Sequence, residues 1–255
     1  MAVTKEQLDR LEAMLRESKR VVFFTGAGVS VPSGIPDFRS ASGIYNEKTR
    51  RTYSPEEMVS HSFLETHPEE FYAFYREKML YPDAKPNRAH LWIAGLEKQG
   101  YDVTVVTQNI DGLHEAAGST KVLDIHGSVH RNYCIRCGKH YPMSFVYGSQ
   151  GVPKCTCGGM VRPDVVLYEE MLNDRVTDAA VRAIRGADML VVIGTSLVVY
   201  PAASYLRFYA GNRLVSVNLS PTSMDSYIDL CIYEDCAKVA EEMEKRGLGK
   251  SSENR

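Results

Sequence analysis

Short apolar runs and helically spaced apolar positions alternate along the chain. Runs with the length of a buried strand occur at 21–25, 103–107, 189–193 and 214–218. Helical stretches lie between or after these runs, at 89–99, 178–185, 202–209 and 236–245. An earlier helix is predicted from Leu8, Leu11 and Leu15, with Thr4 and Gln7 forming a capping box before it. Because strands alternate with helices, the sequence predicts an α/β fold with a doubly wound parallel sheet covered on both faces.

Two regions interrupt this alternation. Residues 40–85 are rich in Tyr, Glu and Pro, and we expect loops and short helices there. Residues 128–163 hold four of the six cysteines, many turn-forming residues and little apolar periodicity. Both regions are predicted to be insertions into a single doubly wound domain, packed on one side of it.

Composition narrows the classes of protein. The chain has 255 residues, of which 44% are hydrophobic, as expected for a globular protein with a real core. A formal net charge of −2 does not provide the basic field that nucleic acids or anionic membranes attract. No apolar run reaches the roughly 18 residues needed to span a bilayer, and residues 1–20 do not resemble a signal peptide. We therefore expect a soluble cytoplasmic protein with neither membrane nor nucleic acid as a direct partner.

The clustered cysteines form two close pairs separated by seventeen residues, 138–154. The four residues are Cys134, Cys137, Cys155 and Cys157. A tight C-x-x-C turn followed by a second cysteine pair predicts a structural zinc site with four thiolate ligands and no open position. The second pair, C-x-C, is one residue shorter than the commonest spacing. Reduced surface thiols are the alternative. A zinc ribbon that binds nucleic acid is disfavoured, because the intervening segment has few cationic residues.

A Gly/Pro-rich stretch from Gly26 to Arg39 follows the first predicted strand. Gly26 and Gly28 permit a tight turn whose backbone N–H groups are suited to phosphate binding. Asp37, Phe38 and Arg39 then place an acid, an aromatic ring and a guanidinium just beyond the turn. This combination indicates chemistry beside a bound nucleotide.

Polar side chains also follow the other predicted strands. The segment 108–111, Gln-Asn-Ile-Asp, comes after the second strand, at the edge where α/β folds bind ligands. His126 follows the apolar run 122–125, and its imidazole is suited to general-base catalysis near neutral pH. Gly194-Thr195-Ser196 and Asn218 end two further strands. Turn-forming polar residues and a structural histidine are the alternatives at this point.

Taken in order, these residues resemble the sirtuin family of NAD-dependent protein deacylases. The matching segments are 26–30, 33–39, 107–111, Leu113-His114, His126-Gly127, the two cysteine pairs, Arg162-Pro163, 194–201 and Val217-Asn218. The resemblance implies a Rossmann-like NAD-binding domain of residues 1–39, 86–127 and 164–255. It also implies a small domain formed by the helical insertion 40–85 and the zinc-binding module 128–163.

The resemblance further implies NAD as a co-substrate, structural zinc, and acyl-lysine proteins as partners. The residues implied in NAD binding are Gly26, Ala27, Gly28, Ser30, Asp37, Phe38, Arg39, Gln108, Asn109, Ile110, Asp111, Gly194, Thr195, Ser196, Asn218, Asp235 and Cys236. The implied catalytic residues are His126, Asn109 and Asp111, with His126 as base for a ribose hydroxyl while the acyl group passes to ADP-ribose and nicotinamide leaves. The residues implied in peptide binding are Val166, Tyr168, Glu169, Val198 and Val199, where the peptide adds as a strand.

Two departures from the family pattern concern the cofactor and the peptide. Val31 replaces a frequent threonine, so we expect a hydroxyl contact to the cofactor to be lost there. Glu169 places a carboxylate beside the peptide, which predicts a preference for basic flanking residues. Tyr75-x-x-Lys78 resembles the Tyr-x-x-Arg of sirtuins that remove succinyl groups, but we expect Lys78 on a solvated helix face and acetyl-lysine as the main substrate.

Other functions remain as alternatives. They are an acidic deacylase of the desuccinylase type, a protein mono-ADP-ribosyltransferase, a dehydrogenase and a non-catalytic zinc-ribbon module. A dehydrogenase fingerprint requires glycine at position 31, where Val31 stands. A zinc-ribbon module leaves the polar residues at the strand ends, His126 among them, without a role.

Overall fold

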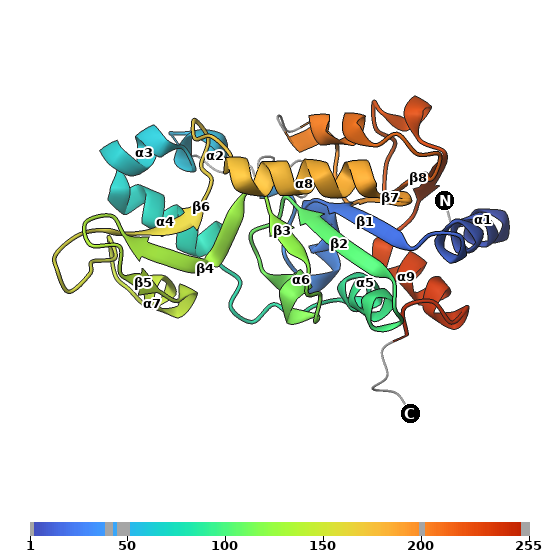
Figure 1. Ribbon diagram of the computed structural model, residues 1–255. Helices are drawn as coiled ribbons and strands as arrows, with labels where there is room; N and C mark the ends of the chain where they lie inside the picture. The colour runs from blue at the N-terminus through green and yellow to red at the C-terminus, as the bar shows by residue number, and fades with distance from the viewer. Residues whose placement is uncertain (1–2, 39–42, 45–51, 199–201, 251–255) are drawn as a thin grey trace.

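The centre of the protein is a six-stranded parallel sheet with the order β3-β2-β1-β7-β8-β9. The computed structural model describes residues 3–38, 43–44, 52–198 and 202–250 (Figure 1). The strands are β1 (Arg20–Thr25), β2 (Asp102–Thr107), β3 (Val122–Asp124), β7 (Met189–Ile193), β8 (Leu214–Asn218) and β9 (Leu230–Tyr233). The four predicted strands and the α/β fold class are thus confirmed, whereas the four-residue strand β9 was not predicted.

Helices cover both faces of this sheet because successive strand residues point to opposite sides. Phe23 packs edge-to-face on Trp92, with ring centroids 5.5 Å apart, in a core shared with the first helix layer. Phe24 faces the other way, into a core that includes Ile184. The first layer contains α1 (Lys5–Arg16), α5 (Arg88–Lys98) and α9 (Cys236–Lys245), and the second contains α8 (Asp174–Gly186) and a 3₁₀ helix (Ala202–Phe208).

The structure confirms the predicted helices, with two differences. Thr4 and Gln7 form the predicted capping box at the start of α1. Helix α8 begins four residues earlier than predicted, because the Asn173 side chain accepts hydrogen bonds from the first backbone N–H groups and starts the helix there. The segment predicted as a helix at 202–209 is a 3₁₀ helix.

A smaller lobe lies beside the sheet, on the left in Figure 1. Its helices are α2 (Pro55–Met58), α3 (His61–Thr66), α4 (Pro68–Lys78) and α7 (Met143–Tyr147), and its antiparallel sheet contains β4 (Gly127–Cys134), β5 (His140–Tyr141) and β6 (Val161–Val165) in the order β5-β4-β6. A separate hydrophobic core, with Phe71 and Val161 fully buried, joins these helices to this sheet. The sheet was not predicted, and β4 and β6 extend past both ends of the predicted insertion 128–163. The domain division stays a prediction.

The sheet has one point where the chain order reverses. From β1 the chain runs outward through β2 and β3, and then returns to β7 on the other side of β1. The turns after β1 and β7 meet there, since the Gly28 N–H donates to the Gly194 carbonyl at 2.8 Å and the Gly26 N–H donates to the Ile193 carbonyl at 3.0 Å. Ligands of open α/β sheets bind at such a reversal, beyond the carboxyl ends of the strands.

Candidate active site

A cleft of about 810 Å³ opens at this reversal and extends to the small lobe. Nearly all the residues predicted for NAD, catalysis and peptide binding line it. They are Gly26, Ala27, Gly28, Ser30, Asp37, Phe38, Gln108, Asn109, Ile110, Asp111, His126, Val166, Tyr168, Glu169, Gly194, Thr195, Ser196, Asn218, Asp235 and Cys236. Val198 is exposed and is not part of the lining, while Arg39 and Val199 lie outside the described residues.

The glycines of the two facing turns have no room for side chains. A Cβ atom on Gly28 would lie 2.7 Å from the Gly194 Cα, and Gly194 itself has a φ of +62°. Beside this cradle, the Asn218 Oδ1 accepts the Thr195 N–H at 2.9 Å. The Asn218 Nδ2 is buried and has no hydrogen-bond partner within the described ranges. Burying an N–H donor without a partner costs free energy unless a ligand pairs with it. The Asn218 amide and the close-packed glycine turns therefore both fit a bound nucleotide.

Ser30 joins the cradle to the polar segment after β2. Its buried hydroxyl donates to the Asp111 Oδ2 at 2.7 Å and accepts from the Asn109 Nδ2 at 3.0 Å. Burial raises the pKa of Asp111, whereas hydrogen bonds from Ser30 and from the Leu113 N–H act in the opposite direction. Through Ser30, the side chains of Asn109 and Asp111 are held at fixed positions relative to one another and to the glycine turn.

The environment of His126 determines which ring nitrogen can act as a base. The Nδ1 atom lies 2.9 Å from the Gln108 carbonyl oxygen, which can only accept, so Nδ1 carries the proton. The lone pair is then on Nε2 of a side chain that lines the cleft. Burial lowers the pKa of His126, and the bond to the Gln108 carbonyl opposes this shift. The imidazole is therefore neutral at neutral pH and able to accept a proton at Nε2.

The segment after β6 forms the opposite wall and is attached to the helical insertion. The Tyr168 N–H donates to the Val59 carbonyl at 3.1 Å, and the His61 N–H donates to the Tyr168 carbonyl at 3.0 Å. Glu170 pairs with Arg162 through both carboxylate oxygens, at 2.8 and 3.1 Å. Burial would raise the pKa of Glu170, but the bonds from Arg162, the Leu167 N–H and His61 outweigh it and lower the pKa to about 2. These bonds hold the wall in place without a peptide.

Glu169 has an unusual conformation within that wall. Its φ of +76° is in the left-handed region, which favours glycine. Its carboxylate accepts the Ser62 N–H and the Ser62 hydroxyl, both at 2.9 Å. The side chain thus ties the cleft wall to α3. The predicted preference for basic flanking residues stays a prediction, with this carboxylate already partly engaged.

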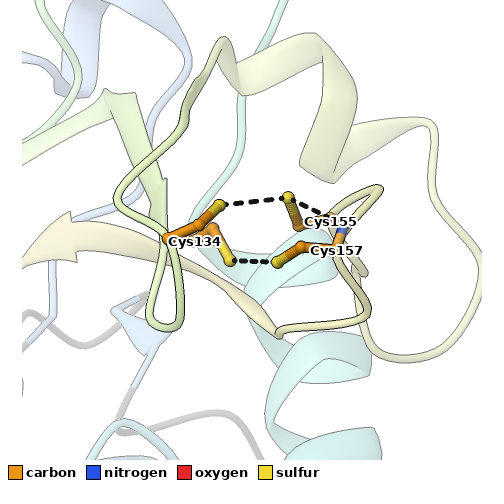
Figure 2. Close-up of side chains that lie close together, drawn as sticks. Cys134, Cys155 and Cys157 are labelled. Carbon is orange, nitrogen blue, oxygen red and sulfur yellow. Dashed lines mark hydrogen bonds between the residues drawn. The ribbon is translucent and has the colours of Figure 1, made fainter.

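The four clustered cysteines bring their thiols together away from the cleft, as Figure 2 shows for the labelled side chains. The Sγ atoms of Cys134 and Cys157 lie 3.5 Å apart, those of Cys137 and Cys155 lie 3.6 Å apart, and all four are within 4.8 Å of one another. Tetrahedral Zn–S bonds of about 2.3 Å separate sulfur atoms by about 3.8 Å, which matches this spacing. The donor set and its geometry therefore fit a metal with a closed four-thiolate shell.

A sequence profile described as the Sir2 family matches residues 26–201. The chain is also 53% identical over 236 residues to an NAD-dependent protein deacetylase of Clostridium perfringens (strain 13 / Type A), covering 92% of this chain and 97% of the relative. The chain belongs to the Sir2 family. The sirtuin resemblance noted in the sequence is thereby confirmed.

Solved structures of Sir2 proteins share the fold as well as the sequence. One holds a deacetylated p53 peptide and 3′-O-acetyl ADP ribose; it has a TM-score of 0.87 and 38% identity, covering 96% of this chain and 99% of that chain. Another holds a p53 peptide and NAD⁺; it has a TM-score of 0.80 and 39% identity, covering 95% of this chain and 98% of that chain.

One expectation about this sirtuin is wrong. Lys78 was expected on a solvated helix face, but its side chain is only 16% exposed and lines the cleft together with Tyr75. The Tyr75 hydroxyl is buried and has no hydrogen-bond partner among the described residues. Lys78 also lies 3.2 Å from a Glu77 carboxylate oxygen. Helix α4 turns this end toward the cleft because its aromatic residues, including Tyr75, are buried in the core of the small lobe.

Sequence reasoning missed other residues that line the cleft of this sirtuin, among them His130 and Glu234. Glu234 directly follows β9, so the rule that polar residues at strand ends bind ligands would have identified it had β9 been predicted. His130 lies within β4, and no local pattern indicated that it faces the cleft.

Proposed function

We propose that this protein is an NAD-dependent protein-lysine deacetylase, which transfers the acetyl group of an acetyl-lysine to ADP-ribose and releases nicotinamide. The observation that carries the proposal is the state of His126 in the cleft: Nδ1 is held by the Gln108 carbonyl, and Nε2 is left as a base at neutral pH. The Clostridium perfringens relative and the peptide-bound Sir2 structures support the same activity.

NAD, when bound, supplies a leaving nicotinamide and the ADP-ribose that accepts the acetyl group. In this chain, the turns at Gly28 and Gly194 carry no side chains and would let the phosphates approach the backbone closely. The Asn218 Nδ2, which lacks a partner in the described part of the chain, would donate to a ribose hydroxyl. Asn109 and Asp111, held by Ser30, would lie at the reacting end. His126 would take the proton of a ribose hydroxyl at Nε2.

The acetyl-lysine peptide would lie along the wall formed by Val166, Tyr168 and Glu169, and extend past the exposed Val198. This wall is already hydrogen-bonded to the helical insertion on its other side, through Val59 and His61. An added peptide strand therefore meets a preorganised edge, which reduces the entropic cost of binding. The sirtuin assignments of Arg39 and Val199 belong to the same proposal.

We also propose that the four cysteines hold a structural zinc ion. Their four thiols leave no open coordination position, and Cys134 and Cys155 are themselves buried in the core of the small lobe. Separate thiols arranged for a metal are typical of reducing compartments, which supports a cytoplasmic location. Within the described part of the chain, every helix is too short or too polar to cross a bilayer.

Mass spectrometry of an acetyl-lysine peptide incubated with NAD tests the proposal. We expect deacetylated peptide, nicotinamide and acetyl-ADP-ribose in equal amounts. His126→Ala should reduce the rate at least about 100-fold, since general-base catalysis contributes that much. His140→Ala, an exposed histidine of β5, is the matched control and should keep full activity. ADP-ribosylated peptide would support a mono-ADP-ribosyltransferase instead, and an unchanged peptide would refute both.

A second candidate activity is removal of acidic acyl groups. It is favoured by the position of Lys78 in the cleft and by the Tyr75 hydroxyl, which has no hydrogen-bond partner among the residues that the structure describes and would face the distal carboxylate of a succinyl group. Since a lysine ammonium lacks the bidentate geometry of arginine, we expect acetyl peptide to react faster than succinyl peptide. Lys78→Met should lower the succinyl-to-acetyl ratio of rates. An unchanged ratio in that variant would contradict the assignment.

A further inference from the structure

Strand β4 contains a bulge that is built from its own polar side chains. Its pairing with β6 shifts register between Ser128 and Asn132. The buried Asn132 side chain donates from Nδ2 to the Val129 carbonyl at 3.0 Å and to the Tyr141 carbonyl at 3.3 Å. The Ser128 hydroxyl accepts the His130 N–H at 3.3 Å. The bulge is therefore tied to β5 of the cysteine-bearing module and keeps a defined shape.

The bulge faces the loop that carries the polar residues after β2. The Val129 N–H donates to the Ile110 carbonyl at 2.9 Å. One residue further on, the His130 Nε2 lies 2.9 Å from the Asp111 carbonyl oxygen, and because that oxygen can only accept, Nε2 is the donor. Two successive carbonyls of the loop are thus held by two successive residues of β4.

The imidazole of His130 also packs directly on the backbone of this loop. Gly112 has a φ of +72°, and a Cβ atom there would lie 2.6 Å from the His130 Cδ2. Any side chain at this position would displace the ring. The loop is accordingly held on one side by the Ser30 hydroxyl, through Asp111, and on the other by β4.

We propose that His130 is a positioning residue for the reacting end of the cleft. Its hydrogen bond holds the Asp111 carbonyl and so sets where Ile110 and the Asp111 carboxyl meet the nicotinamide half of NAD. This inference rests on the proposed function. It concerns a residue that acts through the loop, so its effect belongs to the binding of NAD and nicotinamide more than to the chemical step.

The test compares His130→Ala with His130→Gln, because glutamine retains an N–H donor and alanine does not. One net hydrogen bond corresponds to about a three- to tenfold change in affinity. We expect His130→Ala to raise the KM for NAD and the inhibition constant of nicotinamide by that factor, with kcat changed less than about twofold. His130→Gln should restore both constants toward the wild-type values. Exposed His140→Ala serves as the control and should match wild type.

Several outcomes separate this role from a purely structural one. Equal constants in His130→Ala and wild type, or equal losses in the alanine and glutamine variants, would overturn the proposal. A lowered unfolding temperature in His130→Ala with no change in the NAD constants would assign His130 to stability only. The Kd for NAD can be measured by calorimetry without any peptide, so it tests the role of His130 even if the wild-type protein does not deacetylate. Failure of the His130 proposal is thereby distinguished from failure of the proposed function. A wild-type protein without affinity for NAD would overturn both proposals.

Discussion

His90 makes the stability of this protein sensitive to acid. It is fully buried in α5, its Nδ1 accepts the Asn87 N–H at 3.3 Å, and its ring meets that of His114 with centroids 4.7 Å apart. Burial lowers the pKa of His90 from 6.5 to about 4. Burial, followed by the charge of His90, also lowers the pKa of His114, whose Nε2 lies 3.1 Å from the Thr25 hydroxyl just before the glycine turn. Both imidazoles are therefore neutral in the folded state at neutral pH.

The sign of the pH dependence follows from this shift. Above about pH 6.5 neither state of His90 binds a proton, so its contribution to stability is fully present. As the pH falls, the unfolded chain protonates first, and stability is lost until the folded state also protonates near pH 4. The loss from His90 alone is about 2 kcal/mol at pH 5 and about 3 kcal/mol well below pH 4, since one pKa unit corresponds to about 1.4 kcal/mol.

The variant His90→Gln isolates this contribution. Glutamine at the third helical position can still accept the Asn87 N–H as a capping-box residue, but it does not titrate in this range. Urea unfolding followed by the fluorescence of Trp92, the single tryptophan and a buried residue of the same helix, gives the free energies. Between about pH 7.5 and about pH 5, wild type should lose about 2 kcal/mol more than the variant.

A control and a refuting result complete this test. His140→Gln replaces an exposed histidine and should keep the pH dependence of wild type. If His90→Gln and wild type lose the same free energy to within about 0.5 kcal/mol, the buried neutral state of His90 is wrong as the source of acid sensitivity.

Three further predictions concern the cradle, the peptide wall and the metal. Gly28→Ala should lower the free energy of unfolding by about 1–3 kcal/mol and weaken NAD binding, because the new Cβ meets backbone at 2.7 Å. Gly186→Ala is the control, because its Cβ would have no contact closer than 3.9 Å. It should leave both the free energy of unfolding, measured in urea, and the NAD affinity, measured by calorimetry, unchanged. Glu169→Ala should unfold about 1 kcal/mol more easily than Glu169→Gly, since both lose the bonds to Ser62 but only alanine keeps the strained positive φ; equal stabilities would contradict this. Metal analysis should find one zinc per chain, and Cys155→Ser should lower both the zinc content and the unfolding temperature; a zinc-free protein with wild-type stability would show that the metal is not structural.

Local patterns predicted the features that depend on nearby residues. The apolar runs at 21–25 and 189–193 became neighbouring central strands, since a strand buried on both faces needs continuous apolar residues. The C-x-x-C spacing predicted that the thiols of the two cysteine pairs converge. Strand β9 was missed because its four residues lie between polar segments. The sheet β5-β4-β6 was missed because β5 is only two residues long and because β4 pairs with the distant β6, in a segment rich in turn formers.

The sequence by itself determined the fold class and the family, and nearly all the residues that it predicted for the site line the cleft. Glycines, strand-end polar residues and cysteine spacing are constrained by local geometry, so they are readable along the chain. Only the tertiary structure decided which nitrogen of His126 carries the proton, where the Lys78 side chain lies, and that His130 holds the Asp111 carbonyl. Each of these depends on contacts between separate elements, and such contacts exist only after the chain has packed.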